Sequence, residues 1–313
     1  DMIKFSQLLV VIFLSSCSSS EFFPRLEVIP SSKNLSIIKP SVQRGEYLVN
    51  GPADCGGCHS PREPYSKNKY DRRTKLIKGK ELSGNLMSEN FFVKMYAQNL
   101  TPAGRISNWS DDELKVAIRE GVRPDGSLIG IPMPFSVYRN MSDTDVDSII
   151  LYLRQLEPVK NVESVDSTYS VLNLFTPNNY GPAIKFVPDI DRKDRIKYGE
   201  YLAGPIAHCV VCHTPLGGFP VEHQYSNQLG KGGMEFKGPW GTRIAPNITS
   251  HKDGLGSYTD EQLKKIINEG VTPYGMKLSQ AMNYKSYKRM TEEDLNSLIA
   301  YLRTIPPLPN EED

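Results

Sequence analysis

Two short runs in this chain carry cysteine and histidine, whose side chains can bind a cofactor or a metal, at the same spacing. Residues 55–59 read CGGCH and residues 209–213 read CVVCH, so both fit the pattern C-x-x-C-H. Two thiols three residues apart share one face of a helical turn and can reach the two vinyl groups at one porphyrin edge. The following histidine then lies under the iron as its proximal ligand. This spacing is the attachment signature of a covalently bound c-type haem.

The two motifs therefore predict two covalently bound haem c groups. The attaching thiols are Cys55 and Cys58 in the first motif and Cys209 and Cys212 in the second, and the proximal iron ligands are His59 and His213.

Zinc is the rival interpretation of paired C-x-x-C motifs. Zinc sites are usually closed by two cysteine pairs, or by one pair plus two spaced histidines. Here a histidine follows each pair directly, and the pairs lie 154 residues apart. The fifth cysteine is Cys17, so no pair is left for a structural disulfide. Haem attachment is therefore favoured over a zinc site or a thioredoxin-like redox motif.

The N-terminal residues predict export. Lys4 precedes the apolar run 8–14, which is too short to span a bilayer and is typical of a signal peptide. The run ends in Leu14-Ser15-Ser16-Cys17, which resembles the processing signal of bacterial lipoproteins. We therefore expect residues 1–16 to be a signal peptide, Cys17 to be lipidated, and the Ser-rich residues 17–40 to be a flexible tether. A plain secretory signal with an incidental cysteine is the alternative.

A long internal repeat sets the predicted domain boundaries. The run Gly-Glu-Tyr-Leu occurs at 45–48 and 199–202, and Gly84 pairs with Gly238 at the same offset of 154. Gly121 pairs with Gly270 at an offset of 149, which predicts a net loss of five residues between Gly238 and Gly270. We expect haem domains at 41–157 and 195–313, joined by a linker at 158–194 that packs across both.

Helix signals dominate each copy. Capping boxes begin at Ser110 and Thr259, and looser caps at Ser142 and Thr291 open the last helix of each copy. Further helices are expected around 42–49 and 195–203. No pair of alternating strands with a hairpin signal is evident. The expected fold is all-α, with two tandem helical haem domains.

The second axial ligand is expected to be methionine, which raises the reduction potential of a c-type haem. Two equivalent pairs exist, Met133 with Met282 and Met141 with Met290. Met141 and Met290 sit directly before helix caps, where a hydrophobic staple explains them. Met133 and Met282 are therefore the predicted axial ligands. The alternatives are core packing of these methionines, or ligation of the second iron by another histidine; the remaining histidines are His208, His223 and His251.

The chain resembles the class I-like cytochrome c domains of the cytochrome subunits of bacterial membrane-bound alcohol and aldehyde dehydrogenases. The family pattern continues from C-x-x-C-H through N-[LI]-T-P, a tryptophan before an acidic helix cap, G-V-x-x-D-G and M-P-[FY] to a final helix ending in Y-L-R. The first copy matches nearly throughout, over about residues 41–157. The second copy, over about 195–306, departs at several positions, namely Ser250, Tyr258, Tyr274 and Asn283. Family members commonly carry three such domains.

The expected function is a dihaem electron carrier rather than an enzyme. We expect it to be lipid-anchored on the periplasmic side of a bacterial membrane, and a formal charge of +1 predicts no nucleic-acid partner. The donor is expected to be a membrane dehydrogenase or a quinol-oxidising complex, and the acceptor a soluble cytochrome or a terminal oxidase. The alternatives are a dihaem peroxidase, or an obligate haem subunit of a larger oxidase or dehydrogenase complex.

Overall fold

The computed structural model describes nine stretches of the chain. These are residues 39–63, 76–89, 93–130, 132–161, 168–169, 183–218, 222–238, 241–279 and 281–310. The predicted signal peptide, the lipidation site Cys17 and nearly all of the tether lie outside them. Within these stretches, no helix combines the length and the apolar character that crossing a bilayer requires.

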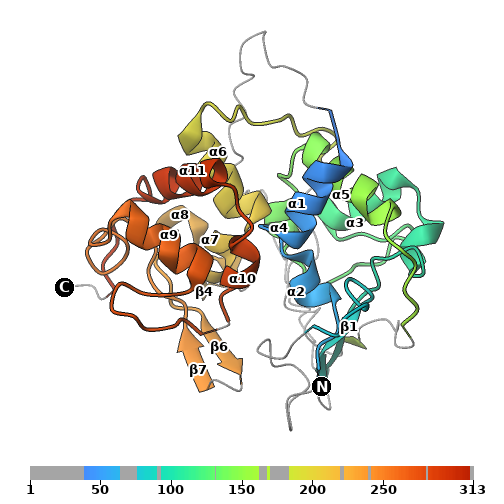
Figure 1. Ribbon diagram of the computed structural model, residues 1–313, viewed down its shortest axis with the longest axis horizontal. Coiled ribbons are helices and arrows are strands. Elements are labelled where there is room, and N and C mark those ends of the chain that lie inside the picture. The colour runs from blue at the N-terminus through green and yellow to red at the C-terminus, as the bar shows by residue number, and fades with distance from the viewer. Residues whose placement is uncertain are drawn as a thin grey trace, which may run out of the picture.

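The elements form two groups that lie side by side (Figure 1). We call residues 39–161 the N-terminal half and residues 195–310 the C-terminal half. The N-terminal half contains α1 (Val42–Asn50), α2 (Cys55–His59), β1 (Asn85–Glu89), β2 (Val93–Ala97), η1 (Arg105–Asn108), α3 (Asp111–Glu120), α4 (Phe135–Tyr138) and α5 (Asp143–Arg154), and β3 (Thr168–Tyr169) follows it. The C-terminal half contains α6 (Arg195–Tyr201), the π-helical turn η3 (Leu202–Ile206), α7 (Cys209–Cys212), β4 (Leu216–Gly217), β5 (Glu222–His223), α8 (Tyr225–Gln228), β6 (Glu235–Gly238), β7 (Gly241–Ile244), α9 (Asp260–Glu269), α10 (Tyr284–Tyr287) and α11 (Glu292–Leu302).

The first and last helices of each half cross closely, α1 against α5 and α6 against α11. Glycine makes the crossing possible. A Cβ on Gly45 would lie 1.9 Å from the carbonyl oxygen of Ser148, and one on Gly199 would lie 1.9 Å from that of Ser297. The glycine of the repeated Gly-Glu-Tyr-Leu run is therefore required by the approach of two backbones.

The predicted helix caps are confirmed. Ser110 accepts from the amide of Glu113, whose side chain accepts in turn from the Ser110 amide, and Thr259 and Gln262 repeat this box. The predicted apolar faces of α5 and α11 are all buried, namely Val146, Ile149, Ile150 and Leu153, and Leu295, Leu298, Ile299 and Leu302. These short-range signals were sufficient because each depends on residues within one turn or one face.

The expectation of an all-α fold is only partly right, because the mostly helical chain also contains three small antiparallel sheets. Their strand orders are β1-β2-β3, β4-β5 and β6-β7. The hairpin strands span only two to five residues. The β1–β2 pairing contains a register irregularity between Leu86 and Ser88, and β7 is exposed along its whole length. Such strands carry no sustained apolar alternation, so the sequence pattern for a hairpin was absent.

The hydrogen bonds also correct the predicted alignment of the two halves. The amide of Gly84 donates to the carbonyl of His59 over 2.8 Å, and the amide of Gly232 donates to that of His213 over 2.8 Å. Gly84 is therefore equivalent to Gly232 and not to Gly238. The C-terminal half is shorter by six residues between the motif and this glycine, rather than after Gly238.

The described parts of the predicted linker contact both halves: the guanidinium of Arg192 lies 5.5 Å from the ring centroid of Tyr198 in α6, and the contacts of Val187 and Asn161 are with the N-terminal half. Val187 is buried. Its carbonyl accepts from the amide of Asp143 over 2.9 Å, and its amide donates to Asp143 Oδ1 over 3.0 Å, at the start of α5. Near the other end of the linker, Asn161 donates to the carbonyl of Ser83 over 2.8 Å. The linker is thus partly fixed to α5 and to the loop before β1.

The two halves also touch directly. Helix α4 contacts η3, which leads into the second C-x-x-C-H motif. The cap amides at the starts of α5 and α11 complete the contact: that of Ser142 donates to the hydroxyl of Tyr201 over 3.1 Å, and that of Thr291 donates to the hydroxyl of Tyr47 over 3.3 Å. The last helix of each half therefore meets the first helix of the other half.

Candidate haem attachment sites

Each C-x-x-C-H motif forms a short helical turn that follows a residue with left-handed backbone. Asp54 and His208, which precede α2 and α7, both have a φ of 44°. Within each turn the two cysteines are half-buried. The predicted spacing is therefore realised as one turn of helix that carries two thiols, three residues apart, on the same face.

Both motif histidines have one ring nitrogen fixed by a backbone carbonyl. The Nδ1 atom of His59 lies 2.7 Å from the carbonyl oxygen of Gln98, and that of His213 lies 2.7 Å from the carbonyl oxygen of Pro246. A carbonyl can only accept, so Nδ1 carries the proton and Nε2 is left with its lone pair. Histidines that bind metals typically hold their second nitrogen in this way.

Burial favours the neutral form of these imidazoles. Desolvation lowers the pKa of His59 and of His213 below the usual value, and the carbonyl contacts at Gln98 and Pro246 offset this only in part. A neutral imidazole is the form that ligates iron.

A buried Asn-x-Thr clamp positions each of these carbonyls. Asn99, directly after Gln98, accepts through Oδ1 from the amide and the hydroxyl of Thr101 over 2.8 Å each. Its Nδ2 donates to the carbonyl of Val159 over 2.8 Å. Asn247 and Thr249 repeat the clamp in the C-terminal half, with Leu308 in place of Val159.

The sequence prediction did not identify the carbonyls of Gln98 and Pro246 as site groups. A backbone oxygen leaves no side-chain signal, and these two residues share no chemistry. The one available signal was the repeated Asn-x-Thr that follows each of them.

The first thiol of each motif is held in its protonated form. Burial raises the pKa of Cys55 to about 12, with a further contribution from the nearby Asp54 carboxylate. Burial and Cys212 raise the pKa of Cys209 to about 12.

Met133 and Met282 occupy equivalent places, just before α4 and α10. Both are partly buried and pack at the edge of the core. Met141 and Met290, by contrast, are 1% and 7% exposed and precede the N-caps of α5 and α11. The structure thus separates the two pairs by burial, while the axial role of Met133 and Met282 stays a prediction.

The remaining histidines all have other contacts. His208 packs edge-to-face on Tyr138, with ring centroids 6.2 Å apart. His223 stacks on Tyr225 with centroids 5.1 Å apart. His251 accepts at Nδ1 from the amide of Asp253 over 3.1 Å. Each contact gives the histidine a structural role.

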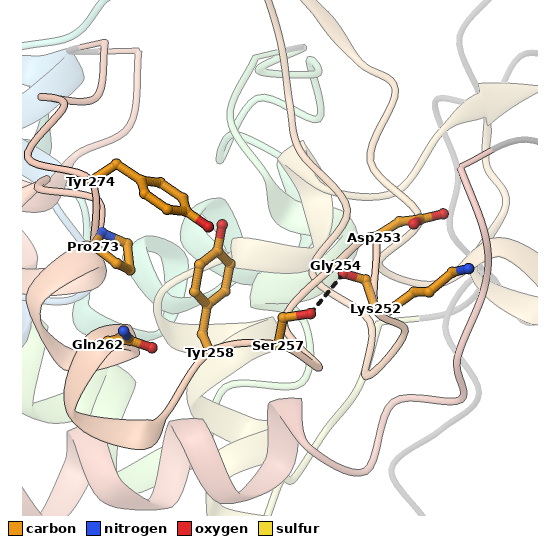
Figure 2. A pocket seen from close by; sticks show the side chains of 8 residues that line it. All are labelled: Lys252, Asp253, Gly254, Ser257, Tyr258, Gln262, Pro273 and Tyr274. Carbon is orange, nitrogen blue, oxygen red and sulfur yellow. Dashed lines mark hydrogen bonds between the residues drawn. The ribbon is translucent and has the colours of Figure 1, made fainter.

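A surface cavity of about 390 Å³ lies apart from the motif residues in the C-terminal half. Figure 2 shows Tyr258 and Tyr274 on one side, with their hydroxyl ends facing each other, and Lys252 and Asp253 on the other. Tyr258 stands where the first half has Trp109. None of the predicted haem residues lines this cavity.

The donor set in each half fits a c-type haem. Each half combines two thiols on one helical turn, an imidazole whose free nitrogen is Nε2, and a partly buried thioether on the segment before a short helix. When bound, a haem would be held by the two thiols through thioether bonds and by the imidazole through Nε2.

Comparison with known proteins gives a family match for part of the chain. Residues 205–306, which include the second C-x-x-C-H motif, match the family model described as Cytochrome c. This part of the chain is therefore similar to cytochrome c.

Longer matches cover most of the chain. It is 27% identical over 286 residues to the fructose dehydrogenase cytochrome subunit of Gluconobacter japonicus, a match that covers 86% of this chain and 53% of that protein. It is 23% identical over 280 residues to the cytochrome c subunit of alcohol dehydrogenase (quinone) from Gluconobacter oxydans, covering 86% and 55%. It is also 23% identical over 275 residues to a protein named diheme cytochrome c-type from Cereibacter sphaeroides, covering 85% and 86%. The chain thus spans about half the length of the two dehydrogenase subunits.

Proposed function

We propose that this chain is a dihaem cytochrome c, with one haem domain in each half, that relays single electrons between redox proteins. A haem held between imidazole and thioether has both axial positions filled and exchanges single electrons. The observation that carries the proposal is the pair of imidazole–carbonyl contacts, 2.7 Å long at both His59 and His213. Because this contact is present at both histidines, each motif offers an imidazole whose Nε2 lone pair is available to bind iron.

Each residue type has a separate task in this proposal. The four motif cysteines form the thioether bonds, and His59 and His213 supply Nε2 to the iron. Met133 and Met282 close the opposite position and exclude water and small ligands from it. The Asn-x-Thr clamps fix the orientation of the imidazoles through the neighbouring carbonyls.

The partners that we propose follow the names of the relatives. Two of them are cytochrome subunits of dehydrogenases, which supports a membrane dehydrogenase or a quinol-oxidising complex as the electron donor. A soluble cytochrome or a terminal oxidase would then accept the electrons. In this arrangement the chain carries electrons for an oxidoreductase complex and catalyses no bond-making step itself.

We further propose that the protein is exported and held at the membrane by a lipid on Cys17. The support is the apolar run 8–14 and the lipoprotein-like residues 14–17. Replacing Cys17 by serine is expected to move the protein from the membrane fraction to the soluble periplasmic fraction. Retention of the Cys17→Ser protein in the membrane fraction would contradict the anchor.

Denaturation of the purified protein tests the haem proposal. A chain with two covalent haems keeps its porphyrin after denaturation, and the pyridine haemochrome spectrum should give two haems per chain. The double variant Cys55→Ser/Cys58→Ser should give one, and Cys209→Ser/Cys212→Ser should also give one. A chain that loses its colour on denaturation would contradict the proposal. Rapid peroxide turnover by the intact protein would favour the peroxidase alternative instead.

A further inference from the structure

The residue before the first motif cysteine differs in charge between the two halves. Asp54 precedes Cys55 and His208 precedes Cys209, and both have the same left-handed backbone conformation. The two halves therefore present a carboxylate and an imidazole from equivalent positions. At this position the backbone conformation is the same and the side chain differs.

The Asp54 carboxylate lies directly against the motif turn. A Cβ on Gly57 would be 2.1 Å from Asp54 Oδ2 and 2.9 Å from Oδ1. The carboxylate therefore occupies the space that any side chain at position 57 would need. The second motif has Val211 at this position, so the valine side chain would occupy the space that a carboxylate needs there.

The opposite half holds this carboxylate in place. Ser286 in α10 donates from its hydroxyl to Asp54 Oδ1 over 2.6 Å, a length typical of a hydroxyl bound to an ionised carboxylate. The equivalent position of α4 is Val137, which is fully buried and has no side-chain donor. A hydroxyl thus binds the carboxylate of Asp54, whereas the position equivalent to Ser286 in the other half carries the apolar Val137.

We propose that Asp54 makes the two haem sites electrically unequal. A ferric haem carries one more positive charge than a ferrous haem, so a carboxylate fixed beside the motif turn favours the ferric form. The haem attached at Cys55 and Cys58 then has a lower reduction potential than the haem attached at Cys209 and Cys212. Electrons run downhill from the N-terminal half to the C-terminal half. This inference rests on the proposed function, because it requires both haems.

The variant Asp54→Asn tests the inference in the full-length protein with both haems bound. Asparagine keeps an oxygen that accepts from Ser286 and removes the charge. In a spectroelectrochemical titration at fixed pH, the lower midpoint is expected to rise. A shift of about 60 mV corresponds to a tenfold change in the ratio of oxidised to reduced haem for a one-electron couple. The higher midpoint is expected to rise less, because the carboxylate lies directly against the first motif turn.

Two further variants make the test specific. His208→Asp/Val211→Gly builds the carboxylate–glycine pair into the second motif and is expected to lower the higher midpoint. Ser286→Ala removes the hydrogen bond and leaves the charge, so both midpoints should keep their order and nearly their values. If Asp54→Asn leaves both midpoints in place, or shifts both equally, Asp54 does not set the difference. A Ser286→Ala shift as large as that of Asp54→Asn would equally overturn the inference. Absence of covalent haem in the wild-type protein would instead contradict the proposed function.

Discussion

Tyr201 in the C-terminal half donates from its hydroxyl to Asp145 Oδ2 in the N-terminal half over 2.8 Å. The reciprocal contact is also present, because Tyr47 donates to Asp294 Oδ2 over 2.6 Å. The two tyrosines are equivalent in the internal repeat, and so are the two aspartates. Each half therefore gives a tyrosine to the other and receives one, as in an isologous interface between two copies of one chain.

Loss of either hydroxyl is expected to destabilise the protein. Asp145 is 5% exposed and Asp294 is 3% exposed, so neither carboxylate can replace a lost hydrogen bond with water. Tyr201→Phe or Tyr47→Phe should each lower the free energy of unfolding by about 2 kcal/mol. Denaturant titration of the purified protein measures this change.

The matched control for these variants lies within one half. Tyr152 accepts from Asn50 Nδ2 over 2.8 Å and is only half-buried. Tyr152→Phe is therefore expected to cost less, about 1 kcal/mol or below. The double variant Tyr47→Phe/Tyr201→Phe should also separate the unfolding of the two halves into two transitions. A Tyr201→Phe protein as stable as the wild type would contradict the assigned role of this interface.

Alanine at position 45 is expected to be strongly destabilising, although α1 is a helix. In an isolated helix, Gly→Ala stabilises by about 1 kcal/mol. Here the new Cβ would lie 1.9 Å from the carbonyl oxygen of Ser148, so α1 and α5 must move apart. We expect Gly45→Ala to lower the free energy of unfolding by about 3 kcal/mol or more. The sign of the change thus distinguishes interhelical packing from helix propensity.

Gly126 supplies the contrasting case. Its φ is 81°, and a Cβ there would meet nothing within 4 Å. Gly126→Ala therefore carries only the backbone penalty of a left-handed residue, about 1–2 kcal/mol. Thermal or denaturant unfolding of both variants compares the two costs. Equal costs would show that the α1–α5 approach is more adjustable than the present packing indicates.

The sequence was most informative where one residue type determines the local structure. The Ser110–Glu113 box predicted the start of α3, because both partners lie within one turn. The repeat showed that the glycine of Gly-Glu-Tyr-Leu recurs, but it did not show why a glycine is needed at this position. Only the fold reveals that Gly45 faces the backbone of Ser148, 103 positions away in the sequence.

The sequence was least informative where backbone atoms, rather than side chains, form the contacts of the site. Gly84 was aligned with Gly238 because both are glycines at a constant offset, whereas the hydrogen bond to the motif histidine belongs to Gly232. The carbonyl of Gln98 orients an imidazole without any contribution from its side chain. Neither feature depends on a residue type that a pattern search would single out.

The pH dependence of stability is expected to contain a contribution from Asp143. Burial alone would raise its pKa, but the amide of Val187 and the guanidinium of Arg119 outweigh this and lower it. The unfolded carboxyl then binds protons more readily than the folded one. The contribution is complete above about pH 4, the ordinary pKa of aspartate, and is lost as the pH falls through the lower folded pKa.

Asp143→Asn tests this contribution. The variant should be less stable than the wild type at pH 6, and the difference between them should shrink as the pH falls below about 4. Free energies of unfolding measured from pH 6 down to about pH 2.5 give the two curves. Curves that run parallel over this range would show that Asp143 is not linked to protons in this way.

The two methionine pairs should respond oppositely to substitution by leucine, which has a similar volume and cannot ligate iron. Met133→Leu and Met282→Leu should each remove about half of the red charge-transfer band of methionine-ligated ferric haem, lower one midpoint potential and open one ferrous iron to carbon monoxide. Met141 and Met290 are buried beside helix caps, so their leucine variants should keep the whole band and cost less than about 1.5 kcal/mol. Visible spectra of the oxidised proteins, with carbon monoxide binding to the reduced ones, separate the pairs. Loss of the band in Met141→Leu with its retention in Met133→Leu would reverse the assignment, because burial would then mark the ligand rather than the packing residue.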